Sequence, residues 1–260
     1  MAGNEIEIVK FLLLNLNKIK IDHIGLVTQV GAPKSGGGFT IINSLPELAL
    51  ISTEGSSKKA DVYINGYGVS LKQSGSSFPF NRLQRAEILE IFKLVGFNNP
   101  EEKLKRIDKE VDDFHNGLIT KRSRPWQNLF DESDFKQLVK FLMTEGSPNL
   151  GYSQHKVDYI LVAPKIGIEL NNIRVFTFDE YFEEFKQNLF FAIRRQWIGQ
   201  SSNSEHSRAV GLAKKTGNQK WLYNNVSGEP RVSKTTGKKW RDEIDVKDRK
   251  TIYMIFVEKK

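Results

Sequence analysis

The segment from residue 59 to residue 73, KADVYINGYGVSLKQ, constrains the fold of this chain more than any other. Apolar side chains alternate with other residues on both sides of Asn65-Gly66, which is the pattern of a half-buried strand pair. Asn-Gly is a preferred sequence for the tight two-residue turn of a β-hairpin. The pattern therefore predicts an antiparallel hairpin, and the residues expected on its apolar face are Val62, Ile64, Val69 and Leu71.

The remaining segments predict a mixed α/β protein. The run VDYILVA at 157–163 is typical of a buried parallel strand, and it would extend the sheet of the hairpin. Residues 31–38 predict a flexible loop that lacks the spacing of a phosphate-binding loop. Helices are expected at 4–19, 79–95 and 178–198, and a mostly helical insertion at about 97–155, with loops at 115–128 and 145–153.

Charge is distributed unevenly along the chain. The whole chain has a net charge of +8, whereas residues 194–260 alone contain 16 basic and 7 acidic residues, a net charge of +9. Aromatic residues such as Trp221 and Trp240 stand among these charges, although disordered basic tails are poor in aromatics. We therefore expect a polyanion-binding surface here. The domain prediction is a core at 1–195 and a basic, β-rich extension at 196–260, packed on the same domain.

Several functional classes are excluded by composition. The chain contains no cysteine, which rules out disulfides, zinc-thiolate sites and cysteine nucleophiles, and agrees with a reducing cytoplasm. The apolar run FLLL near the N-terminus is broken by Asn15, Asn17 and Lys18, and is too short to span a membrane. It also lacks the features of a signal peptide. We expect a soluble protein of the cytoplasm with no membrane partner.

The hairpin carries an acid and a lysine that could serve phosphodiester hydrolysis. Ser70 and Lys72 are two residues apart on one strand and point to the same face, and the turn brings Asp61 toward them. A carboxylate suits a hard cation such as Mg²⁺, which can polarise a phosphate and acidify a bound water. An ammonium can orient that water and offset developing charge. The alternative is that Asp61 and Lys72 are ordinary polar residues of a hairpin.

The string SKKADVYINGYGVSLKQSGSSFPFNRLQR resembles the PD-(D/E)xK nuclease superfamily, and more specifically type II restriction endonucleases. In that superfamily an acid on one strand is followed by (D/E)xK on the next. The resemblance covers roughly residues 45–195, and it includes the helix after the second strand and the later buried strand. It implies a PD-(D/E)xK nuclease-like mixed sheet flanked by helices, and a catalytic set that consists of Asp61, Ser70, Lys72 and Gln73.

The resemblance also implies a function. It predicts Mg²⁺-dependent, sequence-specific cleavage of double-stranded DNA in a prokaryotic cell, and a cognate DNA methyltransferase as a partner. A homodimer on DNA is expected, because a symmetric site is read by a symmetric protein. Ser70 stands where the family has its second acid. We therefore expect the metal ligands to be Asp61 and an upstream acid, Glu54 or Glu47.

Candidate DNA contacts lie on the second predicted helix and in the extension. Arginine suits phosphates and guanine edges, while asparagine suits adenine. Two other functions stay open: a nucleic-acid-binding protein without catalysis, and a repair or junction nuclease of the same superfamily. The predicted DNA-binding residues are Asn81, Arg82, Arg85, Arg194, Arg195, Arg208, Lys214, Lys215, Arg231, Lys238, Lys239 and Arg241.

Overall fold

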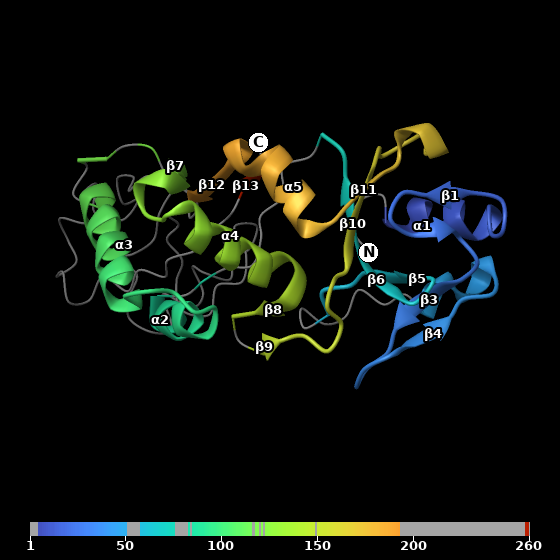
Figure 1. Ribbon diagram of the computed structural model, residues 1–260, viewed down its shortest axis with the longest axis horizontal. Helices are drawn as coiled ribbons and strands as arrows, with labels where there is room; N and C mark the ends of the chain where they lie inside the picture. Colours follow the sequence, from blue (N-terminus) through green and yellow to red (C-terminus); the bar gives the residue numbers. More distant parts are fainter. Residues whose placement is uncertain are drawn as a thin grey trace, which may run out of the picture. The chain divides into compact units, whose positions relative to one another are not determined.

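The computed structural model of the chain describes residues 5–50, 58–75, 83, 85–115, 118–119, 121, 123–148, 150–192 and 258–259 (Figure 1). The chain divides into two compact units. The first comprises Met1–Phe78, Lys136–Leu189 and Lys259–Lys260, and the second comprises Pro79–Phe135 and Phe190–Glu258. No described helix has the length and apolarity needed to cross a membrane.

The first unit is built on a mixed six-stranded sheet (Figure 1), which confirms the predicted mixed α/β class. The strand order is β11-β10-β6-β5-β3-β4. β10 runs parallel to β6, as predicted for the buried strand, and the other neighbours are antiparallel. The strands are β3 (Val30–Pro33), β4 (Phe39–Ile41), β5 (Val62–Ile64), β6 (Tyr67–Gln73), β10 (Tyr159–Ala163) and β11 (Arg174–Phe176).

The predicted hairpin is confirmed by the pairing of β5 with β6. Val62 pairs with Val69 and Ile64 pairs with Tyr67. Asn65 and Gly66 form the turn with φ angles of 52° and 88°, a left-handed conformation that asparagine and glycine tolerate best. The Asn65 carboxamide also accepts a hydrogen bond from the Thr28 amide at 2.9 Å and so ties the turn to the preceding segment.

Helices flank this sheet on both faces. Helix α1 (Glu5–Leu14) buries Ile8, Val9 and Leu12 in one core cluster with Val69 and Leu71 of β6. On β10, Ile160 and Val162 alternate with the residues of this cluster and are buried on the opposite face. Helix α5 (Phe178–Phe185) contacts β10 and β11. The hairpin of β5 and β6 is thus held in a sheet that has apolar packing on its two sides.

Shorter elements complete the first unit. The predicted helix at 4–19 ends at Leu14, because the Asn15 carboxamide donates to the Phe11 carbonyl and Asn17 is left-handed at φ 60°. The shorter elements are β1 (Lys20–Ile21), β2 (Gly25–Leu26), β8 (Gly146–Ser147), β9 (Gly151–Tyr152), the π-helix η3 (Phe141–Glu145) and the 3₁₀ helices η1 (Leu45–Leu50), η4 (Leu170–Asn172) and η5 (Lys186–Asn188).

The second unit packs helices around an aromatic core. The ring of Phe92 stacks on Phe97 with centroids 4.5 Å apart, and Trp126 stacks on Phe135 at 4.6 Å. Phe130 meets the rings of Phe92 and Phe97 edge-on. The elements are α2 (Arg85–Leu94), α3 (Pro100–His115), β7 (Ser123–Pro125), η2 (Trp126–Asn128) and α4 (Glu132–Lys140), and the division between the units falls inside α4.

Further sequence predictions are wrong in part. The loop expected at 115–128 contains β7 and η2, and the loop expected at 145–153 contains β8 and β9. The helix expected at 178–198 ends at Phe185, and β12 (Leu189–Ala192) follows and pairs antiparallel with β7, because the aromatic run LFFA gains a strand partner. The loop expected at 31–38 begins only after β3. At Gly31 of that strand, a Cβ atom would come within 2.5 Å of Phe39 Cδ2, so the close strand pairing requires glycine.

The predicted extension at 196–260 lies outside the described residues, except for β13 (Glu258–Lys259), which belongs to a sheet of order β13-β12-β7.

Candidate active site on the central hairpin

The hairpin brings three of the predicted residues into one hydrogen-bonded group. Asp61 Oδ2 accepts from the Ser70 hydroxyl at 3.0 Å and from the Leu71 amide at 2.7 Å. The Ser70 hydroxyl in turn accepts from Lys72 Nζ at 2.6 Å. Lys72 Nζ lies 3.8 Å from Asp61 Oδ2, which makes an ion pair. Ser70 therefore bridges the acid and the lysine.

The local fold places these side chains on one face of the hairpin. Val69 and Leu71 point into the core with α1, so Ser70 and Lys72 point to the opposite face. Asp61 directly precedes β5, and its amide donates to the Val69 carbonyl at 2.9 Å, which keeps it in register with β6. The side chains of Lys72 and Asp61 are 24% and 30% exposed, so a ligand from solvent can reach both.

A second lysine, which the sequence prediction missed, belongs to the same site. Lys59 stands two residues before Asp61 and is 9% exposed. Its Nζ donates to the Leu142 carbonyl at 2.9 Å, inside the π-helix η3. The pKa of Lys59 is lowered to about 8, because burial and, to a smaller extent, the positive charge of Lys72 outweigh the opposing charge of Asp61. The spacing of two residues between Lys59 and Asp61 is the only sequence signal that could have found this residue.

Among the described residues, no group of three or more acidic, histidine or cysteine side chains stands ready to hold a metal ion. The candidate upstream acid Glu47 is engaged within its own segment: Oε2 accepts from the Asn43 amide at 3.0 Å and Oε1 from the Ser44 hydroxyl at 2.9 Å. These bonds hold the pKa of Glu47 below its usual value. The other candidate, Glu54, lies outside the described residues.

The donor chemistry at Asp61 still fits a magnesium ion. Mg²⁺ is commonly bound through one or two carboxylates, keeps several waters and takes further oxygens from substrate phosphates. The hydrogen bonds that Asp61 accepts from Ser70 and from the Leu71 amide both engage Oδ2, and the side chain is partly open to solvent. Asp61 is therefore the residue that would hold the ion.

The remaining predicted site residues are only partly described. Gln73 is the last residue of β6 and pairs with Ala163 of β10. Arg85 is the first residue of α2. The other predicted DNA contacts lie outside the described residues: Asn81, Arg82, Arg194, Arg195, Arg208, Lys214, Lys215, Arg231, Lys238, Lys239 and Arg241.

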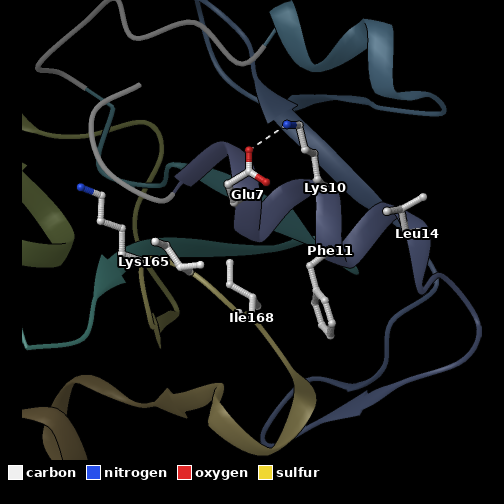
Figure 2. A pocket seen from close by; sticks show the side chains of 8 residues that line it. Glu7, Lys10, Phe11, Leu14, Lys165 and Ile168 are labelled. Carbon is white, nitrogen blue, oxygen red and sulfur yellow. Dashed lines mark hydrogen bonds and ion pairs between the residues drawn. The ribbon is translucent and has the colours of Figure 1, made fainter.

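A cavity of about 440 Å³ lies elsewhere in the first unit, between α1 and the segment after β10 (Figure 2). Apolar side chains of Phe11, Leu14 and Ile168 line it, and Lys10 at its rim is paired with Glu7 at 2.7 Å. None of its lining residues belongs to the group around Asp61. The cavity and the hairpin site are therefore separate features.

Comparisons of the chain with protein-family models, with curated proteins and with solved structures found no match. The function is therefore inferred from the residues and geometry of the hairpin site.

Proposed function

We propose that this protein is a Mg²⁺-dependent endonuclease that cuts double-stranded DNA at a specific sequence, as type II restriction enzymes do. The observation that carries the proposal is the solvent-accessible pair of Asp61 and Lys72 on adjacent segments of the hairpin, with 3.8 Å between the ammonium and the carboxylate. Both residues stand where the PD-(D/E)xK pattern has its acid and its lysine.

The order of elements around the hairpin supports the same family. Helix α2 follows β6, and the buried strand β10 then returns parallel to β6. A helix after the second catalytic strand and a later buried strand are features of the family's common core. A fold alone does not give an activity, so this order supports the proposal only together with the side chains of the site.

Each side chain of the site has a role in phosphodiester hydrolysis. Asp61 would hold Mg²⁺, which when bound polarises a phosphate and lowers the pKa of a coordinated water. Lys72 can orient an attacking water and offset the charge that develops on the phosphate oxygens. Ser70 fixes the two in position, because its hydroxyl accepts from Lys72 and donates to Asp61.

The charge distribution supports DNA as the substrate. The net charge of +9 in residues 194–260 would attract a polyanion, while residues 1–193 have a net charge of −1. Arg85 and the basic residues of the extension are the proposed DNA contacts, and homodimerisation on DNA and a cognate methyltransferase are parts of the same proposal. The charge distribution alone also fits a nucleic-acid-binding protein without catalysis, which is the second candidate.

Digestion of a sequenced plasmid tests this proposal against its alternatives. With Mg²⁺, wild-type protein should produce discrete bands whose ends share one sequence, and EDTA should abolish the cutting. Binding of the plasmid without cutting would support the non-catalytic alternative. Cutting restricted to branched or damaged DNA would indicate a repair or junction nuclease instead.

A further inference from the structure

The group around Asp61 contains more positive than negative charge. We call Lys59, Asp61, Ser70 and Lys72 the hairpin cluster. It has two ammonium groups and one carboxylate, so its net charge is +1 when all three are ionised. An acid at position 70, as in the family pattern, would make the same cluster neutral. The serine therefore changes the charge of the site as well as its set of metal ligands.

Lys59 is an unusual source of this charge because it is buried and forms no ion pair with any residue that the structure describes. Lysine is rarely fully buried unless it is paired. Among the described residues no carboxylate forms an ion pair with Lys59, and its Nζ donates to the neutral Leu142 carbonyl. Asp61 acts on Lys59 through its charge, but it already forms an ion pair with Lys72. The charges of two lysines are thus offset by the one carboxylate of Asp61.

The position of Lys59 is fixed by backbone contacts. Its amide donates to the His155 carbonyl at 3.2 Å, and the next amide, that of Ala60, donates to the same oxygen at 3.0 Å. The Leu142 carbonyl, which accepts the hydrogen bond from Lys59 Nζ, lies in a π-helix, a rare element that often occurs at functional sites. The backbone and the ammonium of Lys59 are therefore both held in place two residues from Asp61, and the charges of Asp61 and Lys72 act on this ammonium.

We propose that the hairpin cluster is a phosphate subsite that binds a phosphate ester without any divalent cation, and that Lys59 is the positioning residue whose charge makes this possible. A phosphodiester has one negative charge, which balances the cluster. The anion would approach Lys72 from solvent, and Lys59 would act on it through its charge. The inference rests on the proposed function only for the source of the phosphate, which is the DNA backbone.

Titration of the protein with anions in EDTA at pH 7 tests this inference. The probes are inorganic phosphate and a dinucleoside phosphodiester, and the readout is the NMR signal of the Leu71 amide, which donates to Asp61. Both probes should shift this signal. Lys59→Met should weaken the binding by roughly tenfold, and Asp61→Asn should strengthen it by a similar factor, because the two changes alter the local charge in opposite directions.

Lys156→Met is the matched control. It removes one positive charge from an exposed lysine of the same unit, which lies over the Tyr152 ring at 5.1 Å, and should change the affinity by less than about twofold. If Lys59→Met fails to fold, the phosphate subsite is still tested by Asp61→Asn, which should strengthen anion binding. No shift of Leu71 with either probe, or equal effects of Lys59→Met and Lys156→Met, would overturn the inference.

The same preparations distinguish this inference from the proposed function. Anion binding in EDTA without plasmid cutting in Mg²⁺ would support the subsite and contradict the nuclease. Cutting in Mg²⁺ without anion binding in EDTA would support the nuclease and overturn the subsite. If inorganic phosphate shifts the Leu71 signal and the phosphodiester does not, the DNA backbone is not the source of the phosphate that the subsite binds.

Discussion

Among the residues that the structure describes, each of the two units contains one buried lysine, and the two lysines have opposite environments. Lys103 in the second unit is 8% exposed and forms ion pairs with Asp134 and with Asp131, the latter at 3.3 Å. Lys59 in the first unit is 9% exposed and donates to a backbone carbonyl. Burial lowers the pKa of Lys103, but the two aspartates outweigh burial and raise it, whereas the pKa of Lys59 falls to about 8.

Under the proposed anion subsite, Lys103 serves the fold and Lys59 serves a ligand. A buried ammonium with its own carboxylates is compensated within the protein, so its removal leaves an unpaired charge behind. A buried ammonium without such a partner costs stability, and strongly perturbed groups of this kind are often found at functional sites. The location of Lys59 beside Asp61 and Lys72 agrees with this interpretation.

The largest expected effect on stability is that of Lys103→Met. The change leaves the carboxylate of Asp134, which is only 9% exposed, without its ammonium partner. The free energy of unfolding should fall by about 3 to 5 kcal/mol, as found when one partner of a buried ion pair is removed. Urea denaturation of wild type and variant measures this, and a loss below about 1 kcal/mol would contradict the structural role of Lys103.

Lys59→Met should have a smaller effect, and its sign should depend on pH. Folded Lys59 has a pKa of about 8, whereas the pKa of an unperturbed lysine is 10.5, so the unfolded state binds more protons between these two pH values. The stability of wild type should therefore rise with pH across that window, by at most about 1.4 kcal/mol per pH unit. Below pH 8 the uncompensated charge costs stability, so Lys59→Met should equal or exceed wild type there.

Urea titrations of wild type and Lys59→Met in EDTA, from pH 7 to 10.5, measure this difference. The free energy of unfolding of wild type should rise relative to that of the variant above pH 8. Parallel stability curves for the two proteins across the whole range would show that Lys59 has no depressed pKa, and the contrast with Lys103 would be lost.

The smallest effect is expected for Asp131→Asn. Asp131 is the exposed partner of Lys103, with 77% of its side chain accessible, and the asparagine keeps a hydrogen-bond acceptor. Solvent screens an ion pair of this kind, so the loss of stability should stay below about 1 kcal/mol. A loss as large as that of Lys103→Met would mean that Asp131 and not the buried Asp134 compensates the lysine.

The sequence predicted the hairpin and its acid–lysine pair because the information is local. Asn65-Gly66 defines the turn, and the period of two then defines which residues share a face. The environment of Lys59 was not predictable in this way, because its hydrogen-bond partner Leu142 is 83 residues away. The same limit explains the helix expected through residue 198, since β12 forms by pairing with the distant strand β7.

Cleavage of plasmid by Asp61→Asn and Asp158→Asn, compared under identical Mg²⁺ conditions, tests the central claim most directly. The two aspartates are matched, because each carboxylate accepts a backbone amide of β6 at 2.7 Å, Asp61 from Leu71 and Asp158 from Gly68. Only Asp61 lies in the hairpin cluster. We predict that Asp61→Asn lowers the cleavage rate by roughly a thousandfold or more, and that Asp158→Asn cuts within about threefold of wild type. Full cleavage by a folded Asp61→Asn variant would contradict the assignment of the hairpin cluster as the active site.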